Sequence, residues 1–340
     1  MPMDLNAMRF KDKIRIADAG RSTCAALYKN YITSEWMDKN MEELLGQGKN
    51  WYKGNLHMHT THSDGSVSPQ EALKIYKKAG YDFVAITDHW MQSQCGMWNG
   101  MLILSGCEWD AGDMVHTPVY HIIGVGMERK VKLARSASLT PQDIINEING
   151  AGGFAILAHP AWSLTDPREA MKLTGLAGAE VYNTMSGLPW NGSRADASLY
   201  FDLWASWGKM VRCIASDDSH GYSGEQAKSY IMVHADDCTA SGLHRSLCDG
   251  YFYASQGPCF KSVSTDGKTV EVDCSSAKYV VFYSNTVWCK DRIADGSEGH
   301  ASYTVKDTDK FVRIEIIDGQ GRRAWYSPFA VNNECKTIKN

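Results

Sequence analysis

Two histidines two positions apart, His57 and His59, lie in the segment NLHMHTTHSDG between ordinary apolar stretches. On a β-strand successive side chains point to opposite faces, so both imidazoles project to one side and Leu56 and Met58 to the other. The spacing leaves two arrangements open. Either the histidines face solvent, or they face a central cavity where they could bind a metal ion.

Further acidic and imidazole side chains accompany the apolar runs that follow. Eight of the eleven histidines lie between residues 57 and 220. The polar residues that end or interrupt separate runs are Asp88, His89, Glu108, His121, His159, Asp218 and His220. In parallel α/β folds functional groups gather at strand ends because those ends converge on one face. Burying so many polar groups together is costly without a cation, and we therefore predict a metal cluster.

From residue 51 to 262, short apolar runs alternate with helix signals. The runs of strand length are FVAITDH (83–89), MLILSGCE (101–108), VYHIIGVG (119–126), GFAILAHP (153–160), AEVYN (179–183) and MVRCIASDDSH (210–220). Ser-Pro-Gln-Glu at 68–71 and Thr-Pro-Gln-Asp at 140–143 are typical of helix N-termini with a capping box. This alternation predicts a parallel sheet with helical crossovers, either open or closed into a barrel.

The two flanks of this α/β region have different patterns. Residues 1–50 predict a polar helical extension that covers one end of the core. Residues 263–340 show strand patterns without helix signals, and Val312, Ile314 and Ile316 alternate there with charged residues before an Asp-Gly turn. We predict a small antiparallel β domain at 263–340. Whether it binds a ligand or partner or braces the α/β domain is left open.

In chain order, the motifs HMHTTHSDG, AITDH, GCE, YHIIG, AHP, EVYN and SDDSH resemble those of the PHP (polymerase and histidinol phosphatase) family. The resemblance covers roughly residues 52–262, and the ordered series is far more specific than any single motif. It implies a distorted (β/α)7 barrel over 51–262 that binds two or three divalent ions and hydrolyses phosphate esters. Imidazole and carboxylate ligands favour zinc, manganese or iron as the ions.

The resemblance also implies how the metal ligands divide among the ions. His57, His59 and Asp218 hold the first ion, Glu108 bridges the first and second, His121 and His159 complete the second, and Asp64, His89 and His220 hold the third. His62 is the alternative to Asp64, although it could equally be a surface loop histidine. Glu180 and Asn183 match a family strand that either completes the barrel or supports a ligand.

The predicted function is hydrolysis of a phosphate ester by a hydroxide that bridges two ions, because coordination lowers the pKa of water toward about 7. His220 or His89 could act as general acid on the leaving oxygen if the third ion is absent. Arg194 is the candidate phosphate clamp, with a solvent-facing loop arginine as the alternative. Phosphomonoesters, cyclic phosphates and phosphodiesters all remain open as substrates.

Other residues near the ligand motifs are weaker candidates for substrate contact. His116 lies in a loop between two ligand strands. Trp90, Trp109 and Trp162 each follow a ligand motif and could form an aromatic wall for a flat group. Packing of the loops explains the tryptophans equally well.

Two rival functions share these features. An amidohydrolase also places an H-x-H strand on a β/α barrel and would hydrolyse C–N or C–O bonds. ITDH followed by the glutamate of GCE, with no lysine suited to bridging at a strand end, favours the phosphoesterase. A non-catalytic metal-binding domain is the second rival, and the intact set of ligand positions speaks against it.

Composition narrows the partners and the compartment. The net charge of −4 argues against a dedicated nucleic-acid binder, and no apolar run approaches the length of a membrane-spanning helix. The N-terminus lacks the apolar core of a signal peptide, and the ten cysteines are dispersed without a C-x-x-C pair. We therefore predict free thiols, a cytoplasmic location and a small-molecule phosphate ester as substrate, with no prediction of oligomeric state.

Overall fold

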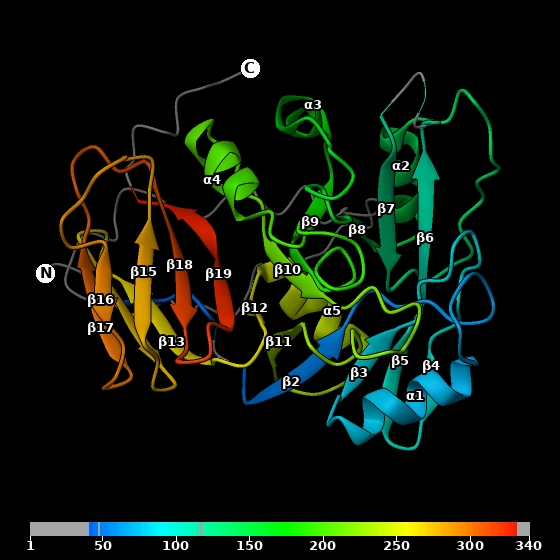
Figure 1. Ribbon diagram of the computed structural model, residues 1–340, viewed down its shortest axis with the longest axis horizontal. Coiled ribbons are helices and arrows are strands. Elements are labelled where there is room, and N and C mark those ends of the chain that lie inside the picture. Colours follow the sequence, from blue (N-terminus) through cyan, green and yellow to red (C-terminus); the bar gives the residue numbers. More distant parts are fainter. Residues whose placement is uncertain (1–40, 47, 114, 116–117, 332–340) are drawn as a thin grey trace, which may run out of the picture.

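The structure, a computed structural model, describes residues 41–331 except 47, 114, 116 and 117. In this part of the chain, nineteen strands form three sheets and five helices pack against them (Figure 1). No helix in the described ranges has the length and apolar character needed to cross a membrane. The fold is a mixed α/β arrangement with several sheets and few helices.

The largest sheet extends through most of the molecule. Its ten strands, in spatial order, are β16 (Ile293–Asp295), β15 (Tyr279–Tyr283), β18 (Phe311–Ile317), β19 (Arg323–Ala330), β12 (Phe252–Ser255), β11 (Tyr230–Ala235), β2 (Asn50–Asn55), β3 (Phe83–Ala85), β5 (Met101–Leu104) and β4 (Gly96–Trp98). Pairing is antiparallel from β16 to β2 and between β5 and β4, and parallel from β2 through β3 to β5. One sheet therefore joins the C-terminal strands to the first strands of the α/β part.

A five-stranded sheet carries most of the remaining motifs. Its order is β10 (Cys213–Ser216), β9 (Leu176–Asn183), β8 (Phe154–Leu157), β7 (Tyr120–Val125) and β6 (Gly106–Ala111). The pairs β10–β9 and β9–β8 are parallel, whereas β8–β7 and β7–β6 are antiparallel. The outer face of this sheet packs in one apolar cluster with α2 (Pro141–Gly150), α3 (Pro167–Lys172) and α4 (Ser198–Ser206).

The two large sheets share an inner apolar core that includes Leu56, Phe83, Ile123 and Ile214. Among the described residues, the β-bridges between these two sheets are isolated pairs, Met58 to Ser219 and His89 to Glu108, and no continuous ladder joins them. The predicted closed (β/α)7 barrel is therefore not confirmed. Backbone conformation gives a reason, because strand geometry ends at residues with positive φ, such as Trp90 (58°) and Asp218 (54°).

The predicted helix starts are confirmed. Ser68 caps α1 (Pro69–Lys78), and its side chain accepts from the N–H of Glu71. Thr140 caps α2 with a complete capping box, in which Asp143 reciprocates. α1 packs on the strands β3 and β5 through Leu73 and Tyr76, and α5 (Ala240–Asp249) contributes Leu243 and Leu247 to the inner core.

The C-terminal strands form a sandwich. The third sheet, β1 (Glu42–Glu43), β13 (Phe260–Thr265), β14 (Thr269–Cys274) and β17 (His300–Thr304), shares an apolar cluster with β15 and β18. The predicted helical extension of residues 1–50 mostly lies outside the described residues. Its described end, 41–50, forms β1, turns and the start of β2 rather than helix.

Seven described cysteines are free thiols, as predicted. Cys248 is disulfide-bonded, so the prediction of free thiols is wrong at that position.

Candidate metal centre

The H-x-H segment directly follows β2 and turns its histidines inward. His57 and His59 are fully buried, and Leu56 and Met58 on the opposite side belong to two apolar clusters. Asn55 accepts a hydrogen bond from the backbone N–H of His57 (2.9 Å), which holds the chain as it leaves the strand. The spacing allowed the two histidines to face either solvent or a central cavity, and in the structure both face the interior.

The first group of side chains comprises His57, His59, Glu108 and Asp218, all buried. Nε2 of His57 lies 3.2 Å from Nε2 of His59, 3.2 Å from Oε2 of Glu108 and 3.1 Å from Oδ1 of Asp218. Nε2 of His59 lies 3.1 Å from the same Glu108 oxygen and 3.2 Å from the same Asp218 oxygen. These five separations are close to the roughly 3.3 Å expected between neighbouring donor atoms around a tetrahedral zinc ion with bonds of about 2 Å.

Glu108 turns its two carboxylate oxygens to different partners. Oε2 faces His57 and His59 and lies 3.3 Å from Nδ1 of His89. Oε1 lies 2.9 Å from Nδ1 of His121 and 3.3 Å from Nε2 of His159. This is the geometry of a carboxylate that can bridge two ions.

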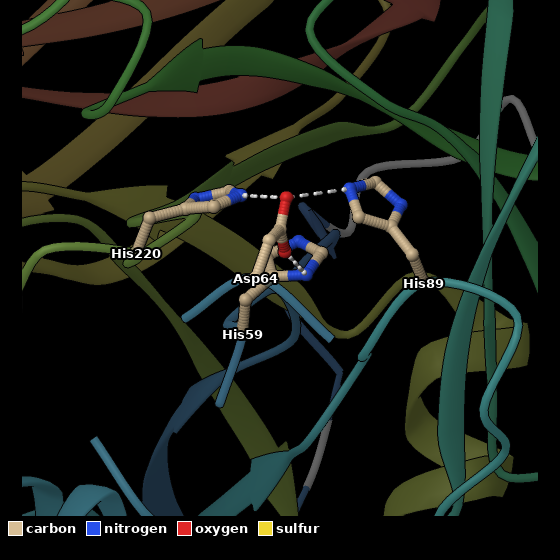
Figure 2. A group of neighbouring side chains, drawn as sticks. All are labelled: His59, Asp64, His89 and His220. Carbon is tan, nitrogen blue, oxygen red and sulfur yellow. Dashed lines mark ion pairs between the residues drawn. The ribbon is translucent and has the colours of Figure 1, made fainter. Parts of the chain in front are cut away.

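A third group comprises His59, Asp64, His89 and His220 (Figure 2). All but His59 are partly exposed, so we call it the solvent-facing group. Oδ2 of Asp64 lies 3.5 Å from Nε2 of His220 and 3.6 Å from Nε2 of His89, and Oδ1 lies 3.5 Å from Nδ1 of His59. The Asp64 side chain is 54% exposed. The structure thus groups Asp64 with these histidines and leaves His62, 57% exposed and 4.0 Å from Asp88, outside.

Charges in the cluster shift several pKa values strongly. Burial disfavours the charged carboxylate of Asp218, but His57, His59 and His220 outweigh it and hold its pKa below the ordinary value. Burial likewise opposes imidazolium at His57, but the carboxylates of Asp218 and Glu108 raise its pKa well above normal. Without a cation, protons must therefore supply the positive charge that the carboxylates need.

The histidines of the solvent-facing group differ from each other. Burial opposes protonation of His220, but Asp64 and Asp218 raise its pKa to about 9. At His89 burial dominates over Glu108 and lowers the pKa. At neutral pH the two rings therefore hold different protonation states.

Of the buried polar atoms that lack a hydrogen-bond partner among the described residues, two belong to this cluster, Oδ1 of Asp218 and Nδ1 of His89. Buried polar atoms in native proteins are nearly always satisfied, so atoms left over in this cluster fit a bound cation. Imidazole and carboxylate donors suit transition-metal ions. The residues present therefore fit divalent metal binding, as the cluster's composition implied.

No family model matches the chain. Among solved structures, a two-domain protein from Bacteroides vulgatus that contains a predicted PHP-like metal-dependent phosphoesterase aligns at TM-score 0.46 and 16% identity, over 85% of this chain and 99% of that one. An amidohydrolase from Chromobacterium violaceum aligns at TM-score 0.36 and 16% identity, over 51% and 89%.

Two curated proteins share sequence with the chain. A 47-residue segment is 54% identical to the DNA polymerase/3'-5' exonuclease PolX of Bacillus subtilis, and this covers 14% of this chain and 8% of the polymerase. A stretch of 120 residues is 32% identical to an uncharacterized protein of Methanocaldococcus jannaschii and covers 32% of this chain and 67% of that protein. The chain belongs to the same family as the Methanocaldococcus jannaschii protein, and its motifs resemble those of the PHP family.

Beyond the predicted metal ligands, three buried carboxylates support the cluster from behind. Glu180 accepts from Nδ1 of His57 (2.8 Å), so Nε2 faces the first group. Asp88 accepts from the N–H and hydroxyl of Thr60 (2.7 Å each) at the start of the Asp64 loop. Asp217, whose pKa burial raises to about 6, accepts from three successive backbone N–H groups at 227–229.

These supporting roles had only weak signals in the sequence. Glu180 was matched to a family strand, and the structure places it as a partner of His57 and of the backbone N–H of His159 (2.8 Å). Asp88 and Asp217 each precede a predicted ligand, and adjacency alone does not show which way a side chain points. Their contacts become visible only once the loops are placed.

The remaining predicted residues do not all lie at the candidate centre. Arg194 is exposed in the loop between β9 and α4, and its side chain has no hydrogen bond or ion pair among the described residues. His116 lies outside the described residues. Trp162 lines the centre, with its ring 4.9 Å from that of His159, whereas Trp109 is buried in the outer apolar cluster and cannot form a substrate wall.

Proposed function

We propose that the protein is a metal-dependent phosphoesterase. The observation that carries the proposal is the buried cluster itself, in which Glu108 faces two sets of histidines and an oxygen of Asp218 is left without a hydrogen bond. Such a set is costly to bury without cations. The cytoplasm is the proposed compartment; the seven free thiols among the described residues support it, and the disulfide at Cys248 does not.

In this proposal the ligand sets follow the observed groups. His57, His59 and Asp218 would hold one ion and His121 and His159 a second, with Glu108 between them, and Asp64, His89 and His220 would hold a third. When bound, zinc, manganese or iron would supply Lewis-acid charge for phosphoryl oxygens and lower the pKa of water to give a nucleophile.

The chain's own residues would handle the leaving group. The solvent-facing group is where an ester would enter, because Asp64, His89 and His220 are all partly exposed there. His220 holds a proton at neutral pH, since its pKa is raised to about 9. His89, with a lowered pKa, does not. Of the two candidates, His220 is therefore the proposed general acid when the third ion is absent.

The test combines metal analysis with a substrate panel. Chelated protein would be reloaded with zinc, manganese or iron and assayed on phosphomonoesters, cyclic phosphates and phosphodiesters, and on amides and lactones. We expect phosphate release, and a loss of at least about 100-fold in Asp218→Asn, because ligand loss costs more than loss of a supporting residue. His300→Ala, a surface histidine of β17, is the matched control with unchanged activity.

Two results would overturn the proposal. Folded protein that takes up no metal would remove its basis. Hydrolysis of amides or lactones without any phosphate release would instead support the amidohydrolase.

A further inference from the structure

A cavity of about 340 Å³ lies beside the metal cluster, at the end of β6. Trp90, Asp110 and Arg135 line it, together with residues 111–112 and 136–137. Asp110 lies two residues beyond Glu108 and directly opposite His121 in the β6–β7 ladder. Residues opposite each other or two apart share a face of a sheet, so the Asp110 side chain lies on the face that carries both candidate ligands.

Trp90 connects the cavity to the cluster from the other side. It directly follows His89, and its backbone N–H donates to the carbonyl of Glu108 (2.9 Å). Its backbone has a positive φ of 58°, which is uncommon for a large side chain and turns the chain sharply after His89. Two residues of the cavity wall, Trp90 and Asp110, are therefore direct neighbours of His89 and His121 in the cluster.

Three side chains in the cavity wall form one connected set. The guanidinium of Arg135 lies 5.0 Å from the ring centre of Trp90, and its Nη2 lies 3.3 Å from Oδ1 of Asp110. The indole N–H of Trp90 donates to the same oxygen of Asp110. The carboxylate of Asp110 thus holds both the indole ring of Trp90 and the guanidinium of Arg135, so Arg135 is oriented before a ligand binds.

Arg135 retains hydrogen-bonding capacity in this arrangement. A guanidinium carries five N–H donors in a planar fork, and Asp110 contacts only one of its nitrogens. The side chain is 67% exposed, and no other hydrogen bond of this guanidinium occurs within the described ranges. An oriented guanidinium with free donors is suited to bind an oxyanion through two parallel hydrogen bonds.

We propose that this cavity binds the leaving-group part of the substrate and that Arg135 receives a second oxyanion on it, a carboxylate or a phosphate. Without the guanidinium, Asp110 would repel such a group, so Arg135 decides whether it is accepted. The preferred substrates are then phosphate esters that carry a second anionic group. This inference rests on the proposed function and names its substrate class.

The test compares matched aryl phosphates with wild-type protein and Arg135→Met. Phenyl phosphate has no second anion, the three isomers of carboxyphenyl phosphate have a carboxylate, and hydroquinone bisphosphate has a phosphate. We expect Arg135→Met to lower kcat/KM at least about 10-fold for esters with a second anion, because a charge-assisted hydrogen bond is lost. Phenyl phosphate should change less than about 2-fold, since it cannot make that bond. Comparing the esters that carry a carboxylate with the ester that carries a second phosphate shows which oxyanion is accepted.

Two further variants sharpen the comparison. Arg135→Lys keeps the charge without the planar fork and should fall between wild type and Arg135→Met. Arg129→Met removes another surface arginine, 3.9 Å from Glu147, and should leave the whole panel unchanged. Equal loss on every ester in Arg135→Met, or no preference for a second anion in wild type, would overturn the inference while leaving the phosphoesterase in place.

A binding measurement separates this inference from the proposed function. Calorimetry with phenylphosphonate and carboxyphenylphosphonates uses compounds that cannot be hydrolysed as esters. The difference in affinity between the two kinds of compound reports the contribution of the cavity. Arg135-dependent binding of the carboxylated compounds without hydrolysis of any ester would overturn the function and support the oxyanion site. Equal binding of these compounds to both proteins would overturn the site.

Discussion

Glu180 contacts four different groups around the first ligand set. It accepts from Nδ1 of His57, the backbone N–H of His159, the amide of Asn183 and the hydroxyl of Ser216. A carboxylate behind a histidine fixes the ring's tautomer and increases the basicity of the opposite nitrogen. Glu180 therefore controls the ligand atom of His57 without facing the cluster itself.

Glu180→Gln should weaken metal binding without unfolding the protein. We expect metal affinity to fall about 10- to 100-fold, because His57 loses the acceptor that sets its tautomer. Chelator competition measures this affinity. Glu147→Gln on the exposed side of α2 is the matched control, and equal affinities in both variants would contradict the role assigned to Glu180.

The raised pKa of His220 predicts a pH dependence of metal uptake. In the metal-free protein this ring is protonated at neutral pH, because its pKa is about 9. A metal ion binds only the neutral ring, so uptake by the solvent-facing group should release about one proton near pH 7 and fewer above about pH 9. Calorimetry in buffers of different ionisation enthalpy measures this release. Proton release that does not change with pH, or that is undiminished in His220→Gln, would argue against it.

At the scale of elements, the ligands lie where the two large sheets meet. The N–H of Asp218 donates to the carbonyl of His57, and the N–H of Glu108 to that of Thr87 (2.9 and 3.1 Å). His159 has a positive φ (26°), as Asp218 does, and non-glycine residues in such conformations cluster at functional sites. The strands β2, β8 and β10 thus end just before candidate ligands, whereas Glu108 and His121 lie within β6 and β7. Short backbone contacts replace the continuous ladders of a barrel.

The loop that carries Asp64 depends on Asp88. Its carboxylate accepts from Thr60 and from the hydroxyl of Ser63 (2.8 Å), so it holds the loop on both sides of the turn. Asp88→Asn replaces one acceptor oxygen by a donor and should release Asp64. We expect loss of the third ion with retention of the other two, measured as metal content per chain after dialysis. Retention of every ion would show that the loop does not need Asp88.

At the scale of the whole molecule, the C-terminal strands are tied to the metal-binding part by buried charges. Arg313 on β18 is fully buried and donates twice to Asp202 on α4 (2.7 and 2.9 Å) and once to Glu315 (2.6 Å). Arg323 on β19 pairs with Asp196 (2.8 Å), in the loop that carries Arg194. These contacts support a bracing role for the C-terminal unit, which the sequence left open.

Removing the buried guanidinium of Arg313 should strongly destabilise the protein. Arg313→Met leaves Asp202 and Glu315 without their partner, and breaking a buried pair in this way costs about 3–5 kcal/mol of unfolding free energy. Urea unfolding measures the loss, with Arg129→Met on the surface as a control expected to change by less than about 0.5 kcal/mol. A loss below about 1 kcal/mol in Arg313→Met would show that the network is not needed for stability.

The predicted boundary at residue 262 can be tested by truncation. A chain that ends there lacks β19, which pairs with β12, and also lacks Trp325, a fully buried member of the outer apolar cluster. We expect it to show no cooperative unfolding transition by circular dichroism. A cooperative transition with retained metal binding would instead support an independent α/β domain.

The sequence by itself determined which residues the structure brings together at the centre. His57 and His59 share a face because side-chain direction alternates along a strand, and His159 and Asp218 lie just beyond the ends of β8 and β10, which converge. These are local properties, readable from spacing. The helix starts at Ser68 and Thr140 are local for the same reason. Glu108 was predicted to end the run 101–108, but it lies inside β6.

Only the tertiary structure decided how these residues are divided and supported. Contacts between segments far apart in the chain determine which partners the two oxygens of Glu108 face and whether Asp64 or His62 joins the histidines. Such contacts also bury Arg313 and place Arg135 over Trp90. The closed barrel was predicted from the alternation of strands and helices, but alternation does not specify whether neighbouring strands pair along their length. Strand pairing, loop placement and burial depend on the energies of contacts between distant segments, and the local patterns of a single sequence carry no information about those contacts.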